Sequence, residues 1–302
     1  MLIDEKALRA FAEKEFQDAG EVTIERLGAG VHGAGYLITA GTGEGSRSYV
    51  VKGLFPEGLG HDYPSDRAAV FLLDLDEYNN LPQHARAIDV LALKGDGSVI
   101  SVGGGKEYYL LMEQVEGTDY FSDLRAFSGK DRLDGRDKAR ITAMAGYLAG
   151  IHAVKKESRS LYWRKVRDII GHGECLMGVF DTYPDGIMSY EEMAEIEKLC
   201  VDWRARLKRK EHRLCQVHGD FHPGNIWFRG DDPSDFVLLD RSRGAWGDSA
   251  DDITALCTNY IFFSAWKHGD LRGAYREGLE LFFADYDRLA KDHELPEVLA
   301  PF

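Results

Sequence analysis

The feature that most constrains this chain is a dense polar segment in its second half. It reads His218-Gly-Asp220-Phe-His222-Pro-Gly-Asn225, and an apolar run ends at Asp240, fifteen residues after Asn225. A β-hairpin is predicted between them, because the apolar runs NIWF and FVLLD flank the polar turn RGDDPSD. Such a hairpin would let two carboxylates and an amide oxygen converge on one point.

That trio, Asp220, Asn225 and Asp240, suits phosphoryl transfer. One carboxylate accepts or orients the proton of the attacking hydroxyl, and the amide oxygen and the other carboxylate hold Mg²⁺ against nucleotide phosphates. Protein kinases use the same spacing of Asp and Asn, followed by a metal-binding Asp. The alternative is a polar turn and a hairpin without chemistry.

The segment HGDFHPGN followed by LLD resembles the signature of the aminoglycoside phosphotransferase family, a kinase-like group that includes relatives of choline kinase. The resemblance implies that Asp220 is the catalytic base and that Asn225 and Asp240 are metal ligands. It makes His218 a support of the catalytic loop, and we expect His222 to shape that loop rather than to act directly.

The resemblance extends from about residue 21 to about residue 265. Downstream, GDSADDI matches a Gly-Asp-x-x-x-Asp pattern, which implies that Gly247, Asp248 and Asp252 support the catalytic loop. The chain departs from the family directly after Asp240, where Arg241 and Ser242 stand in place of an aromatic residue and an acid.

A Gly-rich turn in the first part of the chain supports the same interpretation. Gly28, Gly30 and Gly33 form a GxGxxG pattern, which could indicate a dinucleotide-binding turn. That fingerprint needs a following helix, whereas residues 35–39 read as a strand. Strand, Gly-rich turn and strand is the kinase arrangement, in which backbone amides cover the phosphates. An ordinary flexible hairpin is the alternative.

A lysine is then needed to neutralise the nucleotide phosphates, and Lys52 ends the next apolar strand. Its acidic partner is expected on the following helix. Glu77 is our choice because it shares the inward face of that helix and because the family has an apolar residue four positions later. Asp74 and Asp76 are alternatives.

The segment EYYLLMEQVEG resembles the connection between the two lobes in this family. The resemblance implies that adenine bonds to backbone groups from Glu113 to Val115, with Met112 behind the ring. Plain core packing is the alternative role for Met112.

The sequence predicts an α+β, protein-kinase-like fold with two lobes. We expect a nucleotide-binding lobe over residues 1–115, in which a helix near 65–81 is inserted into an antiparallel sheet. Within this lobe, RAIDVLAL and EYYLLMEQV are predicted strands and GDGSVISVGGG is the connection between them. Residues 116–302 are predicted to form a mostly helical lobe with the catalytic loop and the acceptor site.

The acceptor site is predicted in the helical lobe. A Gly-rich loop, Gly171 to Cys175, could offer His172 or Glu174 to a polar ligand, and the favoured alternative is a plain turn between helices. Four acids follow in the sequence, and they would suit an amine-bearing acceptor or form a solvated face. They are Asp181, Asp185, Glu191 and Glu192.

Lys and Arg total 37 and Asp and Glu total 51, so the net charge is −14. This acidity argues against nucleic-acid and anionic-membrane partners. The N-terminus does not resemble a signal peptide, and no apolar stretch has the length of a membrane span. Four widely spaced cysteines fit a reducing cytoplasm rather than a disulfide scaffold.

Together these patterns predict a small-molecule kinase that uses ATP or GTP and Mg²⁺. Two alternatives remain: a nucleotide-binding regulator that transfers no phosphate, and a metal hydrolase built on His218, Asp220 and His222. A protein kinase fits less well, because HGD replaces HRD and no APE segment follows Asp240. The acceptor, the choice of nucleotide and the oligomeric state are left open.

Overall fold

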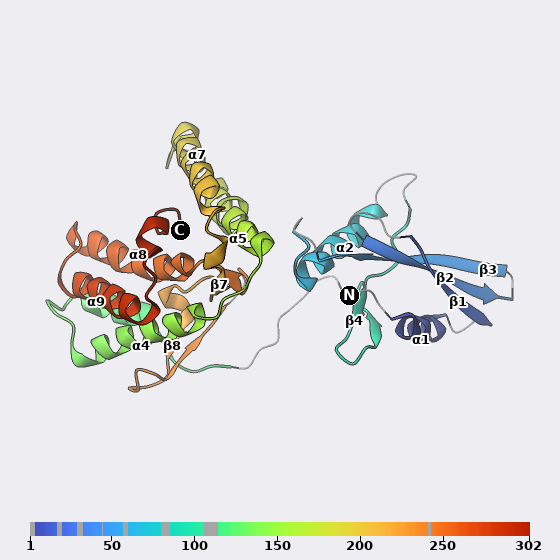
Figure 1. The fold of residues 1–302 in the computed structure, drawn as a ribbon, viewed down its shortest axis with the longest axis horizontal. Coiled ribbons are helices and arrows are strands. Elements are labelled where there is room, and N and C mark those ends of the chain that lie inside the picture. Colours follow the sequence, from blue (N-terminus) through green and yellow to red (C-terminus); the bar gives the residue numbers. More distant parts are fainter. Residues whose placement is uncertain are drawn as a thin grey trace. The chain divides into compact units, whose positions relative to one another are not determined.

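The structure is a computed structural model of the 302-residue chain. It describes residues 4–16, 20–28, 33–43, 45–56, 60–79, 85–105, 114–240 and 243–302. The chain divides into two compact units, Met1–Met112 and Glu113–Phe302, which are described separately below (Figure 1).

The first unit is built around a three-stranded antiparallel sheet in the order β1-β2-β3. Side chains alternate between the faces of a strand, and the buried ones include Val22 on β1 and Tyr36 and Ile38 on β2. The first helix, α1, covers this face with Leu8 and Ala12, both fully buried. The elements of this sheet layer are α1 (Glu5–Glu15), β1 (Glu21–Arg26), β2 (Gly33–Thr42) and β3 (Gly45–Leu54).

The rest of the first unit comprises α2 (Pro64–Tyr78) and a hairpin of β4 (Leu91–Leu93) and β5 (Val99–Ser101). Strand β5 corrects our prediction, because it lies inside the Gly-rich stretch that we expected to be only a connection. The turn explains the difference. The Asp96 side chain accepts hydrogen bonds from the Ser98 amide and hydroxyl, and Gly97 adopts a positive φ of 83°. The glycines therefore close a hairpin.

The second unit is mostly helical, as predicted. Its long helices α4, α8 and α9 pack together, with α9 alongside both others (Figure 1). The α-helices are α3 (Tyr120–Phe127), α4 (Gly135–His152), α5 (Arg159–Gly171), α6 (Leu176–Asp181), α7 (Tyr190–Leu207), α8 (Ser249–His268), α9 (Gly273–Ala290) and α10 (Leu295–Val298).

Short elements place the polar segment within this helical unit. Strand β7, which pairs with β10, leads into the segment, and strand β8, at the centre of the sheet β6-β8-β9, leads out of it. The strands are β6 (Thr118–Asp119), β7 (Cys215–Gln216), β8 (Ile226–Phe228), β9 (Phe236–Leu238) and β10 (Trp246–Gly247), and the 3₁₀ helices are η1 (Glu211–Arg213) and η2 (Pro223–Asn225). The β8–β9 hairpin confirms the predicted hairpin, with Ile226 opposite Leu238.

The core of the second unit contains many aromatic rings, and the hydroxyls of three buried tyrosines in it are paired. The hydroxyls of Tyr120 and Tyr260 lie 2.7 Å apart, and the Tyr275 hydroxyl donates to the Leu124 carbonyl. Buried hydroxyls need such partners, so these bonds fix how α3, α8 and α9 pack.

All four cysteines are free thiols. Cys215 on β7 and Cys257 on α8 are buried, and burial raises the pKa of Cys215 to about 12 and also raises that of Cys257. Cys175 and Cys200 are half-buried.

Candidate active site

Asp252 binds the backbone of the polar segment. It lies in the first turn of α8 and is fully buried. Its two carboxylate oxygens accept hydrogen bonds from the backbone amides of His218 and Gly219, each at 2.7 Å. His152 on α4 contacts the same carboxylate at 3.1 Å and in turn contacts the Tyr286 hydroxyl at 2.8 Å. Asp252 therefore supports the loop that follows β7, as predicted.

The charge of Asp252 is stabilised by these partners. Burial alone would raise its pKa, but the bonds from His152, His218 and Gly219 outweigh burial and hold the pKa of this carboxyl below its usual range. A carboxylate is an acceptor only, so it matches the amides and the imidazole that surround it.

The two histidines of the segment shape its loop. The His218 ring accepts a hydrogen bond from the Asp220 amide at 3.3 Å, and the His222 ring accepts one from the Gly224 amide at 3.0 Å. His222 thereby caps helix η2, which confirms that it shapes the loop. Gly219 has a φ of 90°, a conformation that favours glycine.

Asp220 and Asn225 lie together at the end of this loop. Asn225 Nδ2 donates to the backbone carbonyl of Asp220 at 3.0 Å and to its carboxylate at 3.3 Å. The Asn225 carbonyl in turn accepts from the Leu239 amide at 2.9 Å. Asp240 follows directly, so the hairpin joins the backbone before Asp240 to Asn225.

Asp240 has a positive φ of 51°. Few residues other than glycine adopt this left-handed conformation, although Asp is among those that tolerate it. Unusual backbone conformations of this kind cluster at functional sites, so this conformation makes Asp240 a candidate functional residue.

Arg243 is a residue that the sequence did not single out. Its guanidinium lies 3.3 Å from Asp220 Oδ1, and the His222 ring lies 3.7 Å from the other carboxylate oxygen. The Asp220 side chain is 14% exposed, so these contacts form in a partly shielded place. Arg243 directly follows Arg241 and Ser242, where the sequence departs from the family pattern. That departure was the sequence signal that could have pointed to Arg243.

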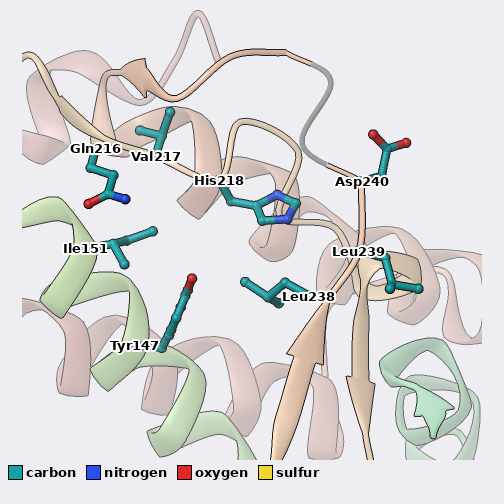
Figure 2. A pocket seen from close by; sticks show the side chains of 8 residues that line it. All are labelled: Tyr147, Ile151, Gln216, Val217, His218, Leu238, Leu239 and Asp240. Atoms are coloured by element: carbon teal, nitrogen blue, oxygen red, sulfur yellow. The ribbon is translucent and has the colours of Figure 1, made fainter. Parts of the chain in front are cut away.

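A cavity of about 190 Å³ lies behind the segment (Figure 2). Tyr147 and Ile151 of α4 form one wall, and the ends of β7 and β9 form the others. The Asp240 carboxylate points away from the apolar side chains in Figure 2. The eight lining residues are Tyr147, Ile151, Gln216, Val217, His218, Leu238, Leu239 and Asp240.

Asp248 fixes the start of α8, the helix that carries Asp252. It caps α8 and accepts bonds from Arg213 at 2.8 and 2.9 Å and from the Tyr162 hydroxyl at 2.8 Å. Arg213 also binds Asp292, beyond α9, at 2.6 and 2.8 Å. Beside Asp248, a Cβ on Gly247 would come within 3.2 Å of the Lys165 and Val217 side chains. Direct support of the loop by Gly247 and Asp248 stays a prediction.

The predicted phosphate-binding residues lie in the first unit. Strand β1 ends at Arg26 and β2 begins at Gly33, the last glycine of the pattern, so strands and not a helix flank the Gly-rich pattern, as predicted. A side chain at Gly33 would collide with the backbone carbonyl of Gly53 on β3. Gly28 is exposed, Gly30 lies outside the described residues, and Lys52 is exposed on β3 opposite Gly35.

Other predicted nucleotide contacts stay predictions. Glu77 lies in α2, but its side chain is outside the described part. Met112 and Glu113 also lie outside the described residues, and Val115 is half-buried.

The predicted acceptor loop follows α5. His172 and Glu174 are exposed, and the His172 ring accepts a hydrogen bond from the Glu174 amide at 3.2 Å. The neighbouring thiol of Cys175 is half-buried, and burial raises its pKa despite the opposing charges of Arg243 and Lys165. The binding of an acceptor by this loop stays a prediction.

Glu192, one of the four acids considered as a contact for the acceptor, has a structural role at the start of a helix. Glu192 forms a capping box with Ser189 at the start of α7, with bonds of 2.8 and 2.9 Å. Asp181, Asp185 and Glu191 are exposed.

Two features are absent from the described residues. No group of three or more His, Cys, Asp or Glu side chains is arranged to hold a metal ion. Within the part of the chain that the structure covers, no helix combines the length and apolar character needed to cross a membrane.

The chain has structural similarity to solved kinases. It resembles choline kinase from Cryptosporidium parvum with 12% identity and a TM-score of 0.39, covering 99% of this chain and 81% of that one. It resembles an aminoglycoside phosphotransferase from Streptomyces rimosus, solved with ADP and streptomycin, with 18% identity and a TM-score of 0.40, covering 99% and 98%. It resembles an ethanolamine kinase from Plasmodium vivax with 11% identity and a TM-score of 0.38, covering 100% of this chain and 80% of that one.

These scores are low, and no curated protein matches the chain significantly. The family assignment rests instead on a match to a family model described as the phosphotransferase enzyme family, APH. That match covers residues 23–291, which is most of the chain and includes the whole polar segment. The chain therefore belongs to the phosphotransferase enzyme family.

Proposed function

We propose that the protein is a small-molecule kinase that transfers the γ-phosphoryl group of ATP or GTP to a hydroxyl of a small acceptor. The observation that carries this proposal is the junction of Asp220, Asn225 and the β9 strand end before Asp240, in a chain of the phosphotransferase family. Phosphoryl transfer depends mainly on positioning and on charge stabilisation, and this site supplies groups for both.

Asp220 is the proposed base. Its carboxylate takes the proton of the acceptor hydroxyl as the oxygen forms a bond to the γ-phosphorus. The bond between that phosphorus and the bridging oxygen breaks, and the nucleoside diphosphate leaves. Asn225 and Arg243, which contact Asp220 at 3.3 Å each, hold the carboxylate in orientation. His218 supports the loop through the Asp220 amide.

Asn225 and Asp240 are the proposed ligands of Mg²⁺. Mg²⁺ prefers oxygen donors and binds proteins through one or two side chains together with substrate phosphates. Both side-chain hydrogen bonds described for Asn225 use Nδ2, so its oxygen is the end suited to a cation. The donor types therefore fit this metal, which would neutralise charge on the phosphates.

The nucleotide is proposed to meet the first unit through Gly28, Gly30, Gly33 and Lys52. Gly33 keeps its backbone close to β3, and Lys52 is exposed and available to phosphate. Glu77 is the proposed partner of Lys52.

Base contacts are proposed for the backbone from Glu113 to Val115, with Met112 behind the ring. The acceptor is proposed to bind near His172 and Glu174, which are both exposed on the loop that follows α5.

Two other functions remain to be separated by experiment. A regulator of this fold would bind nucleotide without transfer. A metal hydrolase would use His218, Asp220 and His222, but both histidine rings already accept hydrogen bonds from the loop backbone. Those bonds favour a structural role for the rings.

The test is release of ADP or GDP with Mg²⁺ across aminoglycosides, amino sugars, choline-like alcohols and simple sugars. We expect one class to stimulate release, and we expect Asp220→Asn to lower turnover by about a thousandfold with little change in nucleotide affinity. Asp240→Ala should weaken Mg-nucleotide binding as well. Full activity of Asp220→Asn would show that the assigned base is wrong. Nucleotide binding without any turnover would favour the regulator, and ester hydrolysis with Zn²⁺ alone would favour the hydrolase.

A further inference from the structure

A buried ion pair lies close to the proposed site and has no part in the mechanism above. Lys165 Nζ on α5 lies 2.7 Å from Asp251 Oδ2 on α8, with the two side chains only 6% and 14% exposed. Lys165 shares the inner face of α5 with Tyr162, Val166 and Ile170, which are buried. A cation in that row of apolar positions is unusual, because Lys is rarely buried.

Stability alone does not explain this pair. Removing two charges from water is costly, and apolar residues of similar size are often at least as stabilising. Burial raises the pKa of Asp251, and the Lys165 charge only partly offsets this. Among the described residues, Asp251 Oδ2 has no hydrogen bond of good geometry, so charge attraction holds the contact.

Lys165 touches both ends of one short segment, Arg243–Gly247. Its Nζ lies 3.5 Å from the carbonyl oxygen of Arg243. Its aliphatic stem packs against Gly247, where a Cβ would come within 3.2 Å of Lys165 Cγ. The lysine therefore fills the space between α5 and this segment.

The opposite side of the segment faces the catalytic loop. The Ala245 carbonyl accepts from the Val217 amide at 3.0 Å. A Cβ on Gly219 would come within 3.0 Å of the Gly244 carbonyl oxygen. From this segment the Arg243 side chain reaches Asp220 Oδ1 at 3.3 Å. One side of the segment is thus held by Lys165, and the other side contacts the loop that carries the proposed base.

We propose that Lys165 and Asp251 are positioning residues for phosphoryl transfer: they fix the segment Arg243–Gly247 and, through Arg243, the orientation of the Asp220 carboxylate. The inference rests on the proposed role of Asp220. Its physical basis is that a long arginine side chain holds a carboxylate in place only if its own backbone is fixed. A displacement of about 1 Å in such a site can cost about a hundredfold in rate.

The kinetic test compares Lys165→Met, Asp251→Asn and Arg243→Gln with the wild type in MgATP turnover. It uses the most stimulating acceptor of the panel, or basal ADP formation if none stimulates. Each variant should lower kcat about tenfold or more while the KM for MgATP changes less than about threefold. The double variant Lys165→Met/Arg243→Gln should lose no more than Arg243→Gln alone, because Lys165 acts through Arg243. Lys165→Arg should restore part of the rate.

The matched control is Lys130→Met. Lys130 also forms a partly buried pair in this unit, 2.7 Å from Asp134 and 2.6 Å from Asp137. It should change thermal stability without changing kcat beyond about twofold. A loss of kcat in this control equal to that of Lys165→Met would show a general effect of stability and overturn the inference.

A second measurement does not depend on turnover. Amide hydrogen exchange in residues 243–247 should become at least about tenfold faster in Lys165→Met and Asp251→Asn, but not in Lys130→Met. Unchanged protection there would overturn the inference, as would multiplicative losses in the double variant. If Asp220→Asn abolishes ADP release while Lys165→Met keeps kcat within about twofold, the inference alone fails. If Asp220→Asn leaves release unchanged, the proposed function fails first.

Discussion

The proposed catalytic loop of the second unit and the proposed phosphate-binding lysine of the first are held in very different ways. The loop is joined to Asp252, which is fully buried and contacts the buried His152. Lys52 is exposed and is placed by the backbone pairing of β3 with Gly35 on β2.

The difference predicts which substitutions should affect stability and activity together and which should affect nucleotide binding alone. Around the catalytic loop the same buried bonds stabilise the fold and position the proposed base, so a substitution should affect both. At Lys52 the side chain contributes little to the sheet, so a substitution should affect nucleotide binding alone. Three experiments test this contrast.

The largest effect is expected for Asp252→Asn. The amide places an NH₂ group where a carboxylate oxygen accepts a backbone amide or His152, and a buried donor is left unpaired. The free energy of unfolding, measured by urea denaturation, should fall by about 3 kcal/mol, and turnover should fall with it. The exposed Asp270→Asn is the control. A loss below about 1 kcal/mol would show that the loop does not depend on this carboxylate.

The next effect is expected for Lys52→Met. The KM for MgATP should rise about ten- to a hundredfold, equivalent to about 1.4 to 2.7 kcal/mol, because a charge opposite the phosphates is lost. The free energy of unfolding should change by less than about 0.5 kcal/mol. Arg47→Met removes another exposed cation from β3 and should leave KM unchanged. Equal effects of the two variants on KM would point to general electrostatic attraction instead of a specific contact.

The smallest effect is expected at Asp292, which binds Arg213 through two bonds of 2.6 and 2.8 Å. Burial opposes ionisation of Asp292, but Arg213 outweighs it and lowers the pKa of this carboxyl. A lowered pKa stabilises the folded state above the unfolded pKa, and that contribution is lost as the pH falls through the folded value.

Asp292→Asn should therefore reduce the free energy of unfolding by about 1 to 2 kcal/mol at pH 7, and the difference should shrink below about pH 4. Asp235→Asn, which breaks the exposed pair with Arg229, should change it by less than about 1 kcal/mol. A difference for Asp292→Asn that stays constant down to pH 3 would contradict the assigned charge pairing.

The predictable parts of the fold are those that depend on local patterns. Residues 35–39, which read as a strand, lie in β2, and NIWF and FVLLD form the β8–β9 hairpin. Strand β5 was missed because glycines at a hairpin turn and in a loop give the same signal. Its three residues are also too few to show alternation.

The same division applies to the site. Asp220 and Asn225 belong to one short loop, so their spacing was enough to predict that they meet. Arg243 and Lys165 come from different segments, and the first lies where no periodic pattern exists. The available signal for Lys165 was its spacing of three residues from Tyr162, which placed a charge on an apolar face. Tertiary contacts decided its role.

Because two thiols are buried, the rate at which they are chemically labelled would measure transient opening of the second unit. Cys215 is fully buried beside the catalytic loop and Cys257 lies within α8, and the pKa of each is raised. Such thiols react with alkylating reagents only when their surroundings open, whereas Cys175 and Cys200 are partly accessible. The rate at which Cys215 becomes alkylated, followed by mass spectrometry, would thus time the opening of the strand that leads into the site.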